Sequence, residues 1–402
     1  MDQRRDGFYM IKETPPMLDV LKTKAGQSHL QVKAWDTLSD IGLPNKKSES
    51  YKFTPIQSVL LKNIDWVSQG EFFFDKTKLY QEKGSHLVFS NGTFVQEYST
   101  LNDLDVVVGQ VTEGKHDPFS LLNAALANNE VTIKSGSELP VFIYHFNSSG
   151  ISNPRIKIKV KSGDTCKIFE KIFPSKSNNT FTNSYIEFDI APNAFGYHTK
   201  VQNYHDKAFT HETVFSKVSK SSHFYNNTFS FEGALVRNNL TIHLKDENCE
   251  GHMYGLFLLD KKSHIDNNTS VDHMEPNSFS NELYKGILDE KSTGVFNGKI
   301  YVRQNAQKTN AFQSNNNILL SEDATLHTKP QLEIWADDVK CSHGCTSGQL
   351  DEGAIFYLRA RGINEKKAKA MILNAFATET MNHIHSKIVE NEVKKLIDKK
   401  LS

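Results

Sequence analysis

The sequence predicts a mainly β protein in which a strand-rich core is flanked by helical regions at both ends. Three patterns indicate this fold class: helical periodicity from about residue 19 to 66, short alternating strands from about 85 to 339, and capped helices thereafter. We therefore divide the chain into an N-terminal helical domain (1–84), a β core (85–345) and a C-terminal helical domain (346–402). A chain of 402 residues is long enough for this organisation.

The N-terminal region contains one helix with clear start and stop signals. Ser28 is a suitable N-cap, and Gly42 followed by Pro44 ends the helix. The apolar residues between them follow one helical face: Leu30, Ala34, Trp35, Leu38 and Ile41. We expect the aromatic side chains of Tyr51 and Phe53 to fasten the following loop to the core.

The central region contains many short strands. Residues 156–160 and 185–190 alternate between apolar and charged side chains, and similar runs occur at 240–244, 254–259, 299–302 and 332–335. Polar clusters such as 175–179 and 315–317 are predicted to separate the strands. This pattern favours an all-β core, but it does not distinguish a sandwich from a parallel β-helix.

The C-terminal region is predicted to be helical. Thr346 with Gln349 fits a capping box, Asp351 and Glu352 suit the positive N-terminal end of a helix, and Gly362 ends it.

A second C-terminal helix is expected after Asn364, which can cap it, and a third from about Val389. The apolar face predicted for the second helix is Ala368, Met371, Ile372, Ala375 and Phe376.

A cluster of potential metal ligands precedes these helices in what we interpret as a short turn. Cys341, His343 and Cys345 offer thiolate and imidazole, which zinc, ferrous iron and iron–sulfur clusters all use. A closed zinc site needs four ligands, and the other cysteines, Cys166 and Cys249, stand alone. Three interpretations stay open: a self-contained metal site, a buried thiol beside a structural histidine, or half of a site that another chain completes.

Composition excludes several classes of function. Lys plus Arg and Asp plus Glu both number 47, so no overall positive field attracts nucleic acid or anionic lipid. No apolar run approaches the roughly 20 residues that span a bilayer, and the start of the chain lacks the apolar core of a signal peptide. The few cysteines favour a reducing compartment, so we predict a cytoplasmic location. Residues 109–116 approach a phosphate-binding loop, but His116 stands where Ser or Thr must hold magnesium. Asp117 and Pro118 instead predict an N-cap and a first-turn proline, so that a helix begins after this loop.

Several segments resemble the SufB/SufD family, the scaffold subunits of the SUF machinery that assembles iron–sulfur clusters. The resemblance is carried by residues 42–44, 49–54, 119–124, 296–300, 311–315, 317–321 and, most densely, 336–363. Residues 340–344 have the SufD form, and Asp266 and His273 also match the family's pattern, where we expect polar ladder residues. The chain departs from the family at Cys345, where a small residue is usual, and at Tyr51 and Phe53, where Trp and Tyr are usual.

This resemblance implies a right-handed parallel β-helix core and a non-catalytic scaffold subunit with two partners. A SufB-like paralog would form a heterodimer at the end of the β-helix, with Cys341 and His343 at the interface. A homodimer is the alternative when the paralog is absent. A SufC-like ATPase would bind the C-terminal helices, through Asp351, Phe356, Tyr357, Arg359 and Arg361.

The resemblance also implies that iron–sulfur clusters are cargo. A transient cluster would form at the heterodimer interface, where His343 would share a metal with the partner subunit, and the isolated chain would hold no stable cofactor. Two other functions stay open: a freestanding metal-binding protein that uses Cys341, His343 and Cys345, and a β-helix enzyme acting on carbohydrate, whose expected secretion signal is absent.

Overall fold

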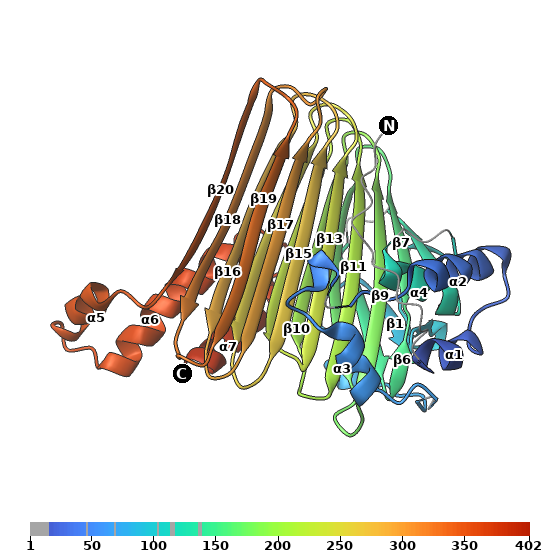
Figure 1. Cartoon of the computed structure of the whole chain (residues 1–402), viewed down its shortest axis with the longest axis horizontal. Helices are drawn as coiled ribbons and strands as arrows, with labels where there is room; N and C mark the ends of the chain where they lie inside the picture. Colours follow the sequence, from blue (N-terminus) through green and yellow to red (C-terminus); the bar gives the residue numbers. More distant parts are fainter. Residues whose placement is uncertain (1–15, 46, 68–69, 103, 113–116, 136–138) are drawn as a thin grey trace.

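The computed structural model is a long parallel β-helix with helices at both ends (Figure 1). It describes residues 16–402 except 46, 68–69, 103, 113–116 and 136–138. Two features used in the sequence analysis lie outside the described residues. They are the chain start, on which the predicted location partly rests, and His116, which argued against a phosphate-binding loop. The predicted fold class is confirmed.

Two sheets share the strands, and the chain passes from one sheet to the other in each turn. The first sheet contains β2 (Thr93–Phe94), β1 (Ser85–Ser90), β5 (Val141–Asn147), β8 (Thr165–Pro174), β10 (Phe195–Asn203), β12 (His223–Glu232), β14 (Glu250–Leu259), β16 (Phe279–Leu288), β18 (Thr309–Leu319) and β20 (Val339–Gly348), in that order. The second contains β19 (Thr325–Ile334), β17 (Thr293–Val302), β15 (His264–His273), β13 (Leu235–Leu244), β11 (Ala208–Val218), β9 (Thr180–Ile190), β7 (Arg155–Val160), β4 (Glu130–Lys134) and β3 (Asp105–Gly109), with β6 (Gly150–Ser152) beside β9.

The turns that lead from the second sheet to the first stack on one another. Five of them, between β9 and β18, each have one residue with a positive φ of 56° to 60°: Asn193, Ser221, Asn248, Asn277 and Lys308. The amide of each donates to a carbonyl in the next turn along the helix; Asn193 N, for example, lies 3.0 Å from Lys220 O. Asparagine tolerates this left-handed conformation better than most residues, which suits it to three of the five positions. The stacking gives successive coils the same register.

The core between the sheets is formed by columns of side chains from successive coils. Ile186, Val214 and Leu240 are neighbours in one such column, and all three are buried. Because strands alternate inward and outward residues, a constant register keeps each column apolar or polar along the helix.

The N-terminal helices α1 (Pro16–Lys22), α2 (His29–Ile41), α3 (Ile56–Asn63) and α4 (Pro118–Leu126) cover the outer face of the second sheet and share a core with it. Ser28 caps α2 by accepting from Gln31 N, and Gly42 ends it with φ 69°, as predicted. The loop that follows is fastened as expected: Tyr51 is buried, and the Phe53 ring stacks on His327 with centroids 4.0 Å apart.

A buried ion pair anchors the same loop to the β-helix. Arg237 and Asp266 pair on neighbouring strands, Arg237 Nη1 donates to Ser50 O at 2.9 Å, and Thr54 donates to Asp266. Asp266 is thus a polar ladder residue, as predicted, and so is His273, whose Nε2 lies 2.8 Å from Ser280 Oγ.

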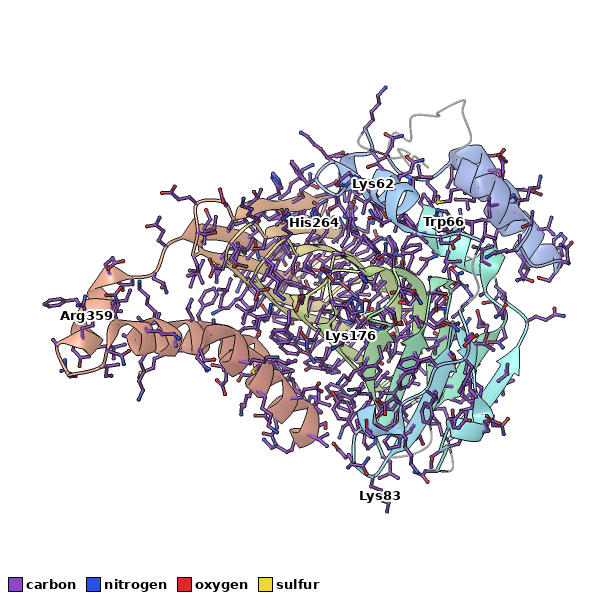
Figure 2. All side chains as sticks on the ribbon, turned by 90° about the horizontal axis from the view of Figure 1, so that it is seen from below. Lys62, Trp66, Lys83, Lys176, His264 and Arg359 are labelled. Atoms are coloured by element: carbon purple, nitrogen blue, oxygen red, sulfur yellow. The ribbon has the colours of Figure 1, made fainter. Side chains whose placement is uncertain are left out.

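The C-terminal helices α5 (Glu352–Arg359), α6 (Glu365–Thr378) and α7 (Lys387–Leu401) have two different positions. Helix α7 packs on the outer face of the first sheet through the buried side chains of Val389, Val393 and Ile397. Helix α5 and the first part of α6 instead project past β20 as an arm, with Arg359 near its tip (Figures 1 and 2). The last part of α6 packs on the first sheet through Leu373 and Ala377.

Four sequence predictions need correction. Residues 341–345 are not a turn but lie in β20, and residues 315–317 are not a separator but lie in β18. The side chains of Asn315 and Asn317 are buried and bond to each other at 2.8 Å, so their hydrogen-bonding groups are satisfied within the strand.

The other two corrections concern the C-terminal helices. Thr346 is no helix cap, because it lies in β20 and its hydroxyl donates to Asn316; Asp351 caps α5 by accepting from two amides. The predicted face of α6 is wrong at Met371 and Ala375, which are exposed, whereas the buried residues are Ala368, Leu373 and Ala377. The caps predicted at Asp117 and Asn364 are confirmed.

Candidate functional site

The last coil of the β-helix is uncovered among the described residues. Strand β20 ends the first sheet and β19 ends the second, so each has one edge without a neighbouring strand in the described chain. Except for Val339 and Cys341, which are half-buried, every residue of β20 is exposed. An unpaired edge of this length offers a row of backbone donors and acceptors to another chain.

The predicted ligand residues lie on one face of β20. Cys341 packs against the core, and Cys345 Sγ donates to Thr328 Oγ1 of β19 at 3.2 Å. Because side chains alternate along a strand, His343 lies on this same inner face between the two cysteines. The structure therefore places Cys341, His343 and Cys345 in one row at the open end of the β-helix.

This row does not form a metal site on its own. Cys341 and Cys345 are four residues apart, which is about 13 Å along an extended strand, too far for both thiols to reach one ion. In the described part of the chain, the ligand atoms that come within 4.8 Å of one another belong to His223, Glu250 and His252 instead.

The thiols of Cys166, Cys249 and Cys341 are not activated. Burial raises the pKa of Cys341, and it raises the pKa of Cys166 to about 12 and that of Cys249 to about 11. All four cysteines are free. Since the thiolate is the reactive and metal-binding form, Cys166 and Cys249 are inert core residues, which agrees with their isolation in the sequence.

A buried polar column leads to His343 from inside the β-helix. Glu282 of β16, Gln313 of β18 and His343 of β20 occupy equivalent register positions. Gln313 Nε2 donates to Glu282 Oε2 at 2.6 Å, and both side chains are buried. Burial raises the pKa of Glu282 to about 7. Sequence analysis missed this column; its only signal is a polar residue recurring once per coil at the same inward position.

The residues predicted to bind an ATPase differ in their exposure and in the contacts they make within this chain. Asp351 is the N-cap of α5, Arg359 Nη1 lies 3.3 Å from Glu365 Oε2, and the Arg361 guanidinium lies over the Tyr357 ring at 3.6 Å. Phe356 is 73% exposed and Tyr357 55% exposed. Met371 of α6 is also exposed, so the projecting arm carries three exposed large apolar side chains.

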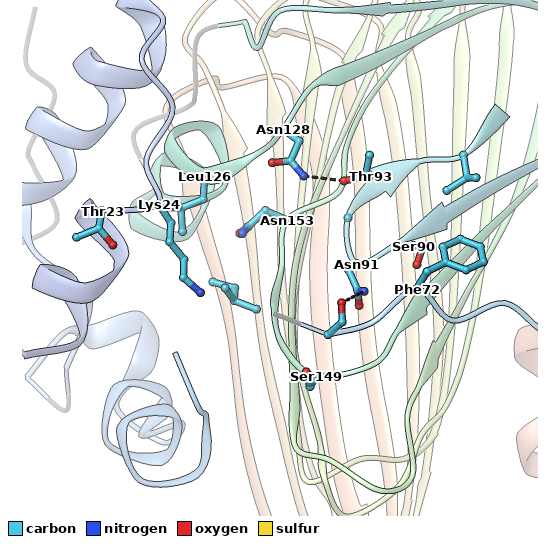
Figure 3. A pocket seen from close by; sticks show the side chains of 14 residues that line it. Thr23, Lys24, Phe72, Ser90, Asn91, Thr93, Leu126, Asn128, Ser149 and Asn153 are labelled. Atoms are coloured by element: carbon cyan, nitrogen blue, oxygen red, sulfur yellow. Dashed lines mark hydrogen bonds between the residues drawn. The ribbon is translucent and has the colours of Figure 1, made fainter. Parts of the chain in front are cut away.

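A cavity of about 640 Å³ lies far from β20, between the N-terminal helices and the first coils of the β-helix (Figure 3). Its described lining is mostly polar, and Lys24, which donates to Val67 O, is the one charged side chain among those residues. The described lining of this cavity includes no carboxylate, imidazole or thiol, the side chains that most often bind metal ions. No helix in the described chain is long and apolar enough to cross a membrane.

Comparison with known proteins gives a consistent result. A family model for the SufBD core domain of the SUF system of FeS cluster assembly matches residues 143–376. The iron–sulfur cluster assembly protein SufD of Escherichia coli is 30% identical over 94% of this chain and 93% of its own. An iron–sulfur cluster assembly SufBD family protein of Synechocystis is 31% identical over 87% of this chain and 86% of its own. The similarity therefore includes the flanking helical regions as well as the β-helix.

The buried Glu282 predicts a pH-dependent stability. A carboxyl whose pKa is raised on folding binds its proton more tightly in the folded chain, so its stabilising contribution is complete below pH 4.5 and is lost as the pH rises through 7. The loss amounts to roughly 3 kcal/mol at about 1.4 kcal/mol per pKa unit. Denaturant unfolding should show a smaller fall in stability between pH 5 and 8 for Glu282→Gln than for the wild type. The exposed control Glu322→Gln should keep the wild-type slope; equal slopes for all three would contradict the assignment.

Proposed function

Because this chain belongs to the SufBD family of the SUF iron–sulfur cluster assembly system, we propose that it is the SufD-type scaffold subunit of an assembly complex. In this proposal it catalyses no reaction alone, pairs with a SufB-like paralog and binds a SufC-like ATPase. The observation that carries the proposal is the uncovered last coil, with His343 facing the open end of the β-helix.

The unpaired backbone edges and partly buried apolar side chains of the last coil support the proposed pairing with the paralog. In the described part of the chain, its two outer strands each have a free backbone edge, and the side chains of Leu326, Leu332 and Val339 are only partly buried. The end of a second β-helix would supply strands for the edges and apolar cover for these side chains. Without the paralog, a second copy of this chain would offer the same edge, and a homodimer would form.

Cluster assembly is proposed to take place at this interface. His343 would contribute one imidazole, and a single imidazole holds iron weakly, so thiolates would come from the partner subunit. The cluster is cargo that leaves the complex, and the isolated chain is proposed to hold no stable cofactor at this interface. The free cysteines favour the cytoplasm as the place of action.

The ATPase is proposed to bind the arm formed by α5 and the first part of α6. Of the five residues predicted for this contact, Phe356 and Tyr357 are the ones whose exposed apolar area suits a binding hot spot. Asp351 supports the contact by capping α5, and Arg361 supports it by holding the Tyr357 ring.

Hydrogen exchange tests the pairing edge. When the SufB-like paralog is added to the full chain, amides in residues 339–348 should exchange more slowly, because their free edge gains hydrogen-bond partners. Amides of α2, on the far part of the molecule, serve as the internal control and should be unchanged. Protection elsewhere but none in β20 would place the paralog on another surface.

Substitution of His343 tests the cluster site. In the complex purified without oxygen, His343→Ala should reduce cluster content, followed by visible absorption, by roughly tenfold, the scale expected when a metal site loses an essential group. Cys345→Ala should change it little, since this thiol bonds to Thr328 and lies about 13 Å from Cys341 along the strand. Both variants should still bind the paralog in gel filtration. Wild-type cluster content in His343→Ala would leave this residue with a structural role only.

Substitution of Phe356 tests the arm. Phe356→Ser should weaken capture of the SufC-like ATPase by roughly tenfold or more, because an exposed aromatic anchor contributes strongly to binding. Val32→Ser on α2, another exposed apolar residue, is the matched control and should bind like the wild type. Truncation after Gly348 is a weaker design, because it also removes α7 and exposes the first sheet. Undiminished capture by Phe356→Ser would exclude the arm as the main contact.

A further inference from the structure

The outer face of the first sheet carries a second cluster of ligand groups, several coils away from β20. Strands β12 and β14 begin side by side, and their register pairs His223 with Glu250 and Tyr225 with His252. Glu250 and His252 are two residues apart on β14 and therefore lie on the same face. Strand pairing thus brings His223, Glu250 and His252 together.

The three side chains converge on one point. His223 Nδ1 lies 3.0 Å from Glu250 Oε2, and His252 Nε2 lies 2.9 Å from the same oxygen. The contact of His252 has hydrogen-bond geometry, whereas His223 Nδ1 is buried without a hydrogen-bond partner among the described residues. A buried nitrogen that faces a carboxylate oxygen without a hydrogen bond between them is the arrangement that a shared cation would satisfy.

Aromatic neighbours hold both imidazoles in position. Tyr225 stacks on His252 with ring centroids 4.2 Å apart, and Phe195 stacks on His223 at 4.6 Å. Tyr254 Oη lies 3.5 Å from His252 Nδ1, which leaves Nε2 directed at the cluster. Such partners fix the orientation of a ligating imidazole.

The loop before α7 covers one side of the cluster. The His383 ring stacks on Tyr254 at 4.3 Å and lies 6.5 Å from the His252 ring, and the loop is held by Asn227, which donates to His383 O. The cluster is consequently half-enclosed: the side chain of His252 is 10% exposed, that of His223 23% and that of Glu250 35%.

The donor set indicates the class of ion. Two imidazole nitrogens and one carboxylate oxygen suit Zn²⁺ or Fe²⁺, whereas Mg²⁺ and Ca²⁺ prefer sites made entirely of oxygen. Three protein ligands leave a position open for water or for an exchanging ligand.

We propose that His223, Glu250 and His252 form a binding site for a divalent transition-metal ion, Zn²⁺ or Fe²⁺, on the outer face of the β-helix. The site is separate from the row on β20 and lies within a single chain, so it requires no partner subunit. It would allow the chain to hold a metal ion before or apart from its assembly into the complex.

Metal titration of the full-length chain tests the proposal. After treatment with chelator and its removal, the chain should bind one Zn²⁺ in calorimetry and, in a second arm without oxygen, one Fe²⁺ at the same residues; Mg²⁺ should not compete. Glu250→Gln, which preserves side-chain size, and His252→Ala should each weaken binding by at least roughly tenfold. Circular dichroism identifies any variant that fails to fold.

Two control variants make the outcome decisive. His343→Ala removes the β20 imidazole, and His29→Ala removes an exposed imidazole on α2; both should bind like the wild type. No uptake by the wild type would overturn the proposal. It would equally be overturned if Glu250→Gln and His252→Ala both kept wild-type affinity, or if His343→Ala lost it.

Discussion

The hydrogen bonds that stack one turn on the next determine the rest of this structure. Five turns each place a residue in the left-handed conformation, and the amide of that residue donates to the adjacent turn. At Asn193, Asn248 and Asn277 the side chain itself favours this backbone, whereas Ser221 and Lys308 adopt it at a higher cost, which the inter-turn bond offsets. Because the turns coincide, each strand starts in register, and equivalent side chains lie about 4.8 Å apart in neighbouring coils.

The same stacking explains why the last coil suits an interface. Each coil satisfies the edge of the coil before it, so the final one has nothing in the described chain to satisfy its own. The chain leaves the β-helix at Gly348 and enters α5 at Glu352, so the open edge and the projecting arm are joined by a short connection. In the proposed complex, the paralog and the ATPase would therefore contact the two ends of one continuous segment.

Sequence analysis predicted those features whose cause is local. The caps at Ser28, Asp117 and Asn364 are confirmed because a cap depends on a side chain and amides a few residues away. The polar run at 315–317 looked like a turn, and the ligand segment on β20 did too, because the hydrogen bonds that make them strands come from other coils. The sequence pattern could not distinguish a sandwich from a β-helix for the same reason. Alternation within a strand does not specify which other strand pairs with it.

The two candidate metal sites also show that closeness along the sequence is a poor guide to ligand sets in this fold. Cys341, His343 and Cys345 are conspicuous in the sequence because they are close together in it, yet along an extended strand the two thiols lie too far apart to share an ion. His223 lies close to Glu250 and His252 only because β12 pairs with β14, so no short sequence motif contains all three residues. In a β-helix, closeness between strands counts for more than closeness along the chain. A ligand set is therefore better sought among residues one coil apart, and a row along the last strand is better interpreted as one side of an interface.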